Sequence, residues 1–141
     1  VYRRAFKHGI PKAYIKNYND YLQVGSGWKW HEDITLDTPL GTVYFCHGKT
    51  ADVFKLAQSL GMSAVQGHYH SLYGCRYYGN SLGLYYGLQC GCLIDPKALA
   101  FKYNKLQKAR PVIGTAVIIN GIPILEPMIL DKSGKWIGKL L

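Results

Sequence analysis

The sequence predicts an α/β (α+β) fold with a βαβ unit at residues 42–66 and a β-rich carboxyl-terminal region. Apolar runs at residues 42–46 and 63–65 flank a segment whose apolar residues recur every three to four positions. That pattern is typical of a strand, an amphipathic helix and a second strand. Beyond residue 70, short tyrosine-rich and β-branched runs separated by glycine indicate antiparallel strands.

The region before this unit is expected to contain two helices and a strand. A helix over residues 2–8 would stop at Gly9. Pro11 would open a second helix over residues 12–22, which carries an apolar stripe of helical period. Residues 28–31 alternate tryptophan with lysine and histidine, the pattern of a half-buried strand.

The βαβ unit has recognisable boundaries at each step. The apolar strand 42–46 is expected to be central in a sheet. Thr50 is the expected N-cap of the helix, with Asp52 in its first turn, and Gly61 closes it. Because such a crossover is right-handed and its strands are parallel, both strands should end at the same edge of the sheet.

The carboxyl-terminal region should contain two antiparallel pairs of strands. Asn120-Gly121 is a hairpin signal. Asp95 and Pro96 favour a short helix over residues 95–101, and residues 131–136 form a last turn and strand. The strands expected in the two pairs are 72–78 with 84–88, and 112–120 with 122–130.

Length and composition are those of one globular domain, which we expect to span residues 1–141. The chain is 48% hydrophobic and 18% charged, which excludes a disordered protein. It lacks an apolar run of about 18 residues, so no membrane span is expected. The four cysteines do not form paired zinc-binding motifs, so reduced thiols and a cytoplasmic location are expected.

The charge favours anionic partners. Seventeen lysines and arginines stand against eight acidic residues, for a formal net charge of +9. Phosphate esters and nucleic acid are both compatible with this excess, because bulk electrostatics attracts either. Twelve tyrosines would serve as stacking surfaces for bases or as ordinary strand residues.

Three histidines come after the two predicted parallel strands. His68 and His70 lie two positions apart, so in an extended chain they point to the same side. His47 comes directly after the preceding strand, and His47 and His68 each have a glycine neighbour, Gly48 and Gly67. Imidazoles converging at one sheet edge form half of a site for zinc, manganese or iron.

With His47-Gly48 and Gly67-His68-Tyr69-His70 in this order, the chain resembles the carboxyl-terminal half of the calcineurin-like metallophosphoesterases. The resemblance is specific over residues 41–70 and looser over the β-rich region beyond them. It implies half of a β-sandwich flanked by helices and a site for two divalent ions (Mn, Fe or Zn). By resemblance, His47 and His68 share one ion and His70 binds its neighbour.

Three motifs of that family, Asp-x-His, Gly-Asp and Gly-Asn-His, do not occur in this sequence. The opening segment is similar to the residues just downstream of the Gly-Asn-His motif in that family, so we expect the chain to start there. The resemblance then implies a separate amino-terminal half chain that completes the site. Together they would hydrolyse phosphate mono- or diesters. Two-metal hydrolysis needs bridged ions, so this chain alone should be nearly inactive.

Three further residues are candidates for substrate binding. His31 comes after Trp30 and is a candidate for lining the cleft. Tyr73 and Arg76 come after His70, and an arginine suits bidentate contact with phosphate. A solvated surface position is the alternative for each. The alternative function is a non-catalytic, basic, tyrosine-rich module that binds nucleic acid or stabilises an assembly.

Overall fold

The computed structural model describes residues 2–94 and 109–138 and has a mixed α/β structure in which strands outnumber helices. This confirms the predicted class. The chain divides into two compact units, Val1–His31 and Glu32–Leu141, which are described separately. None of the described helices is long and apolar enough to cross a membrane.

The first unit contains three short helical elements. The predicted first helix is present, and Gly9 lies just beyond it with a left-handed φ of 70°. The single helix predicted over residues 12–22 is wrong, because Ile15 is extended and Asn17 starts a new helix by accepting a hydrogen bond from the Asp20 amide at 2.9 Å. The elements are α1 (Tyr2–Lys7), a 3-10 helix (Lys12–Tyr14) and α2 (Tyr18–Leu22).

The strand predicted over residues 28–31 is also wrong. Trp28 and Trp30 instead stack on each other, with ring centroids 6.0 Å apart and planes 18° from parallel. The Asn19 side chain donates to the Trp28 carbonyl at 3.3 Å and accepts from the Trp30 indole nitrogen. The alternation therefore places two rings on one side of a loop without any strand pairing.

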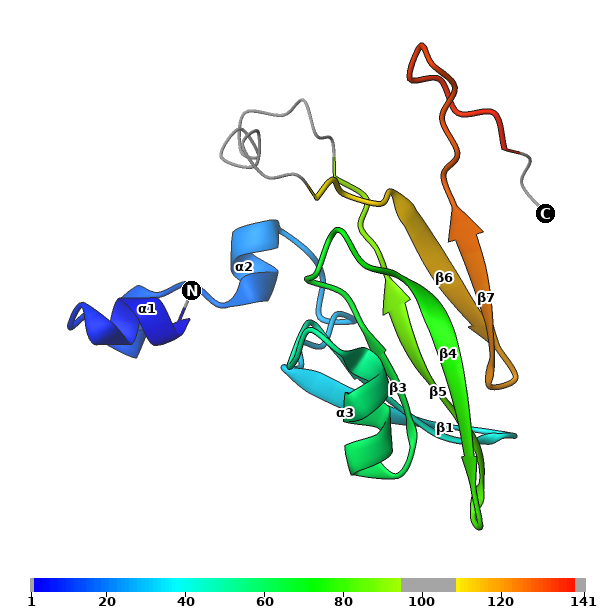
Figure 1. Ribbon diagram of the computed structural model, residues 1–141. Helices are drawn as coiled ribbons and strands as arrows, with labels where there is room; N and C mark the ends of the chain where they lie inside the picture. Colours follow the sequence, from blue (N-terminus) through cyan, green and yellow to red (C-terminus); the bar gives the residue numbers. More distant parts are fainter. Residues whose placement is uncertain (1, 95–108, 139–141) are drawn as a thin grey trace. The chain divides into compact units, whose positions relative to one another are not determined.

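The second unit is built on a five-stranded sheet in the order β1-β2-β3-β5-β4 (Figure 1). β2–β3 and β3–β5 are parallel, whereas the outer pairs β1–β2 and β4–β5 are antiparallel. The predicted parallel crossover and the tyrosine-rich hairpin are thus confirmed. The strands are β1 (Asp33–Thr38), β2 (Gly41–Cys46), β3 (Ser63–Gln66), β4 (Tyr73–Asn80) and β5 (Gly83–Cys90).

Helix α3 (Val53–Leu60) connects β2 to β3. Its N-cap is Asp52 and not Thr50, because the Asp52 carboxylate accepts from the amides of Phe54 and Lys55 at 3.0 and 3.2 Å. Gly61 ends the helix with a left-handed φ of 64°, as predicted.

The helix packs on one face of the sheet. Val53 and Ala57 from α3 are buried against Ala64 of β3. Gly87 of β5 allows the close approach, since a β-carbon there would lie 2.6 Å from the Phe54 α-carbon. This contact fixes the amino-terminal end of α3 over the middle of the sheet.

A hairpin of β6 (Gly114–Ile119) and β7 (Ile122–Pro127) packs on the other face (Figure 1). Asn120 and Gly121 form its turn with φ of 53° and 90°, as predicted. Side chains of the hairpin contact a core of Val43, Tyr86 and Leu88. The second unit therefore has three layers: a helix, a five-stranded sheet and a hairpin.

The remaining predictions concern the ends of this region. The helix predicted over residues 95–101 lies outside the described residues. The predicted final strand is reduced to an isolated bridge between Leu130 and Trp136. Between them, the Asp131 carboxylate accepts hydrogen bonds from the amides of Ser133 and Lys135, which form a turn.

Candidate metal centre

The candidate centre lies where β2 and β3 end. The two strands are parallel, and their last residues, Cys46 and Gln66, are in register. His47 comes directly after β2, and His68 is the second residue after β3. Because parallel strands end at the same edge, the two imidazoles meet there, as the sequence predicts.

The two imidazoles are in direct contact. His47 Nε2 lies 3.1 Å from His68 Nδ1, and the ring centroids are 4.9 Å apart. Both side chains are exposed. His68 has a left-handed φ of 68°, a conformation that is uncommon for residues other than glycine. The local backbone is therefore held in an unfavourable shape that directs this imidazole toward His47.

A buried glutamine holds the loop that carries His47. Gln66, the last residue of β3, is fully buried. Its Nε2 donates to the Thr50 carbonyl at 2.6 Å, and its Oε1 accepts from the Lys49 amide at 3.2 Å. Buried amide groups need such partners, so these bonds fix the backbone just beyond His47.

A second glutamine extends the same network to the loop that carries His68. Gln89 of β5 is also buried, and its Oε1 accepts from Gln66 Nε2 at 3.0 Å. Its own Nε2 donates to the Gly67 carbonyl at 2.7 Å. We name Gln66 and Gln89 the amide clamp. Its two side chains bind both histidine loops, which explains how two separate loops keep one geometry.

The amide clamp was not predicted from the sequence. Its signal was present, since each glutamine lies at or next to the carboxyl end of a largely apolar strand. Strand ends at an edge of a sheet are positions where a buried polar group has loop backbone to bind. The position of a polar residue at a strand end is therefore a stronger sign of an ordered site than the residue type by itself.

An ion pair attaches the His47 loop to the edge strand β1. Lys49 Nζ lies 2.7 Å from the Asp33 carboxylate, which also accepts from the Tyr44 hydroxyl at 2.9 Å. The hydrogen bond from Lys49 is the main cause that lowers the pKa of Asp33, and the same bond raises the pKa of Lys49. Both groups are therefore charged at neutral pH.

His70 belongs to the same loop as His68, but it is not grouped with the imidazole pair. Its carbonyl accepts from the Val112 amide at 2.8 Å, which ties this loop to the segment before β6. Among the described residues, no three histidine, cysteine or acidic side chains lie close enough to hold one metal ion. His47 and His68 thus form a pair, with His70 separate from it.

The geometry of the pair is close to that of two ligands of one ion. Nitrogens that bind one zinc ion at about 2.0–2.1 Å lie roughly 3.3–3.4 Å apart in tetrahedral coordination. The observed 3.1 Å is slightly shorter, so a small movement of one ring would bring the pair to that spacing. The described part of the chain adds no third ligand to the pair, so it supplies half of a coordination shell.

The three candidate substrate residues lie in different places. His31 belongs to the first unit. The Tyr73 hydroxyl donates to the Thr115 carbonyl of β6 at 3.0 Å, and burial raises its pKa. The Arg76 guanidinium lies 4.1 Å from the Phe54 ring centroid, on the helix side of the sheet. Tyr73 and Arg76 therefore lie on opposite faces of β4.

In the structure the four cysteines are free thiols. Burial raises the pKa of Cys46, Cys75 and Cys90. Thiols with a raised pKa are poor metal ligands at neutral pH, because the thiolate is the form that binds. They act here as small packing groups of the sheet.

Comparison with known proteins adds no relative, since no family model, no curated protein and no solved structure matches this chain. The chemistry of the histidine pair is therefore inferred from its own geometry and surroundings.

Proposed function

We propose that this chain is the carboxyl-terminal half of a dinuclear-metal phosphoesterase similar to the calcineurin-like metallophosphoesterases. It would hydrolyse phosphate mono- or diesters when completed by a chain that carries the Asp-x-His, Gly-Asp and Gly-Asn-His motifs. The observation that carries the proposal is the 3.1 Å approach of His47 and His68 from the ends of two parallel strands. Four free thiols favour a cytoplasmic setting.

In this proposal the three histidines are divided between two metal ions. His47 and His68 would hold one divalent ion, and His70 would hold its neighbour; manganese, iron and zinc all accept imidazole. When bound, such a pair of ions activates water and stabilises the charge on the phosphoryl oxygens. The remaining ligands, including a bridging carboxylate, would come from the partner chain, which makes both chains necessary for activity.

The competing explanation is a hydrogen bond between two neutral imidazoles, since 3.1 Å is also a normal hydrogen-bond length. An exposed hydrogen bond contributes only about 0.5–1.5 kcal/mol. Three features serve this contact: the left-handed φ of His68, the lack of a side chain at Gly48, against which His68 packs closely, and the amide clamp. Their combination supports a binding site, because strained backbone concentrates at functional positions.

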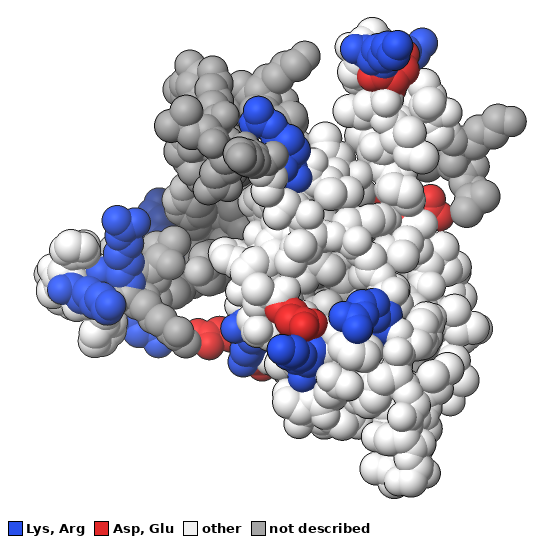
Figure 2. Space-filling view, viewed as in Figure 1, with Lys and Arg blue, Asp and Glu red and all other residues white. Residues whose placement is uncertain are grey.

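The charge distribution gives less support to nucleic-acid binding. Within the described part of the second unit, on the face shown in Figure 2, lysine and arginine side chains lie in small groups separated by uncharged surface. A nucleic-acid interface normally needs a continuous basic stripe or patch. The net charge of +9 is also compatible with a phosphate-ester substrate.

Native mass spectrometry with metal analysis tests the proposal. The full chain, carrying an affinity tag, is expressed in its native host and purified without chelators. We expect a complex of this chain with a second polypeptide and two divalent ions. The complex should hydrolyse p-nitrophenyl phosphate or bis-p-nitrophenyl phosphate, whereas the tagged chain alone should not.

Matched variants then assign the activity to the histidines. His68→Ala and His70→Ala should each abolish hydrolysis, whereas His8→Ala, in the first unit, should leave it unchanged. A complex that contains no metal, or that stays inert with manganese, zinc and iron, would contradict the proposal. A steep fall of nucleic-acid affinity with salt, without hydrolysis, would favour the alternative module.

A further inference from the structure

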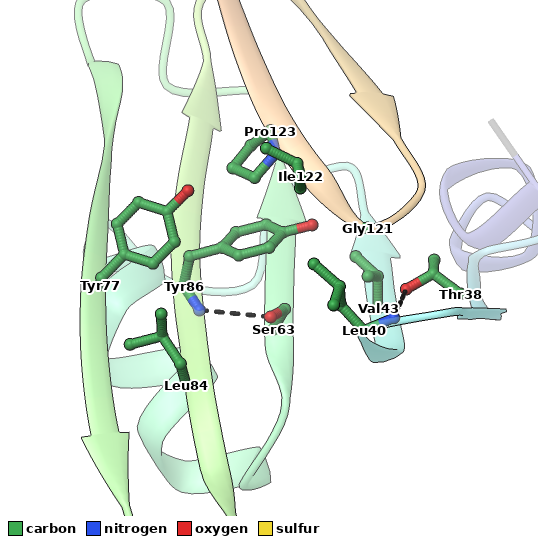
Figure 3. A pocket seen from close by; sticks show the side chains of 10 residues that line it. All are labelled: Thr38, Leu40, Val43, Ser63, Tyr77, Leu84, Tyr86, Gly121, Ile122 and Pro123. Carbon is green, nitrogen blue, oxygen red and sulfur yellow. Dashed lines mark hydrogen bonds between the residues drawn. The ribbon is translucent and has the colours of Figure 1, made fainter.

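A second concave site lies at the opposite edge of the five-stranded sheet from the histidines. The cavity has a volume of about 480 Å³ and lies between the sheet and the tip of the β6–β7 hairpin (Figure 3). Its floor includes Val43 and Ser63, which pair near the starts of β2 and β3. Small-molecule sites have volumes of roughly 300–1,000 Å³, so the size suits a ligand.

The walls of the cavity are uncharged. All ten described residues that line it are neutral. Leu40 and Leu84 line it with side chains that are 64% and 66% exposed, so apolar surface borders the opening. An ion moved into such surroundings loses hydration without gaining a charged partner. The chemistry therefore selects a neutral and largely apolar occupant.

One polar group in the cavity is unpaired. Tyr86 is 4% exposed, and its hydroxyl has no hydrogen-bond partner among the described residues. Its ring extends from β5 into the cavity, with the hydroxyl end on the side of Val43 and Ile122 (Figure 3). Buried hydroxyls are almost always hydrogen-bonded, so this one indicates a missing partner.

The unpaired Tyr86 hydroxyl is able to donate a hydrogen bond at neutral pH. Burial raises the pKa of Tyr86 to about 12, so the phenol keeps its proton at neutral pH. Two neighbouring hydroxyls are already engaged. Ser63 Oγ accepts from the Tyr86 amide at 3.2 Å, and Thr38 Oγ1 donates to the Gly41 carbonyl at 2.6 Å.

We propose that this cavity binds a small, neutral, largely apolar molecule with a hydrogen-bond acceptor, and that the Tyr86 hydroxyl donates to that acceptor. An aryl ketone represents this class. The site is formed by different residues from the candidate metal centre, so it does not depend on the phosphoesterase proposal. A side chain from another polypeptide is the competing occupant.

Two probes of matched shape separate the hydrogen bond from apolar burial. Acetophenone carries a carbonyl oxygen where α-methylstyrene carries a methylene group. Both are titrated into the ¹⁵N-labelled full chain and followed by NMR. We expect saturable shifts at the Ser63, Tyr86 and Gly121 amides, with acetophenone binding about 3–10-fold more tightly, the effect of one neutral hydrogen bond.

Two tyrosine variants complete the test. Tyr86→Phe keeps the ring and should fold, since it removes only an unpaired hydroxyl; it should abolish the preference for acetophenone. Tyr85→Phe removes a hydroxyl from the neighbouring residue, on the opposite face of β5, and should preserve it. Absence of saturable shifts, or equal affinity of the unchanged chain for both probes, would overturn the proposal. So would a purified complex in which a second polypeptide protects these amides and excludes acetophenone.

Discussion

A β-carbon at position 48 would lie 2.5 Å from the β-carbon of His68, closer than real side chains approach. Gly48 comes directly after His47, so the residue beside one imidazole makes room for the other. Glycine is needed at position 48 because the His68 side chain approaches it closely. It is not needed there for a left-handed backbone, which is found at His68 instead. The distance between the imidazoles therefore depends on the absence of a side chain at Gly48.

Gly48→Ala should separate the imidazole pair. The added methyl group would also lie 3.0 Å from His68 Cγ, so the ring must move away. If the pair binds metal, the affinity of the full chain for Co²⁺ should fall about 10–100-fold, as for other changes that misplace a ligand. The visible absorption of Co²⁺ measures this affinity.

Gly79→Ala is the matched control for this prediction. A β-carbon at Gly79 would meet its nearest neighbour, the Gly83 carbonyl, at an ordinary 3.9 Å. Cobalt affinity should therefore be unchanged. Equal affinity in Gly48→Ala and the unchanged chain would show that the histidine pair is not a metal site.

Gln66→Leu should destabilise the second unit and loosen the His47 loop. The change removes the hydrogen-bond partner of the Lys49 amide, of the Thr50 carbonyl and of the Gln89 side-chain oxygen. Buried unpaired groups are costly, so we expect the free energy of unfolding to fall by about 2–4 kcal/mol. Urea denaturation measures this loss, and the Lys49 amide should exchange hydrogen faster.

Gln58→Leu on the exposed side of α3 is the control for the amide clamp. It makes the same chemical change at the surface, where the effect on stability should stay within about 0.5 kcal/mol. If both variants unfold at the same urea concentration, the hydrogen bonds of the clamp contribute nothing measurable.

The central part of the fold could be predicted from sequence because its signals are local. The apolar strands, the helical spacing that ends at Gly61 and the Asn120-Gly121 turn each act within a few residues. The same locality explains the errors. Asn17 capped a new helix where an apolar stripe indicated a single one, and the tryptophans of residues 28–31 stacked in a loop with the spacing of a strand.

The histidine pair could be predicted from the sequence, whereas the hydrogen bonds that hold its two loops could not. Two histidines beside glycines at parallel strand ends indicated convergence, and His47 and His68 do converge. The amide clamp joins residues 66 and 89, which are far apart in sequence and neighbours only through the β3–β5 pairing. That pairing has no local signal. The position of each glutamine near a strand end could be noted from the sequence, but neither their hydrogen bond to each other nor the unpaired Tyr86 hydroxyl could be inferred.

Asp33→Asn should weaken the pH dependence of stability in acid. The hydrogen bond from Lys49, followed by that from Tyr44, lowers the pKa of the folded Asp33 below its ordinary value of 3.8. Its stabilising effect is therefore present above that ordinary value and is lost as the pH falls through the lower, folded pKa. The urea midpoints of the two proteins should differ at about pH 6, and the difference should be smaller at about pH 2.5.

Lys49→Gln should reproduce this effect, because it removes the other member of the ion pair. Lys55→Gln, on the exposed surface of α3, should retain the acid dependence of the unchanged chain. A midpoint difference for Asp33→Asn that is equal at both pH values would mean that the ion pair does not affect acid stability.

Cys90 should react slowly with iodoacetamide in the folded chain at neutral pH. Burial is the largest cause that raises the pKa of this thiol, and only the thiolate reacts. Labelling should therefore be slower in the folded chain than in urea, where the thiol is exposed and has its ordinary pKa. Peptide mass spectrometry resolves Cys90 from Cys92, and the intact mass before reduction reports any disulfide. A Cys90–Cys92 disulfide, or labelling as fast as in urea, would show that the strand end of β5 is open to solvent, contrary to its packing against Val43 and Leu88.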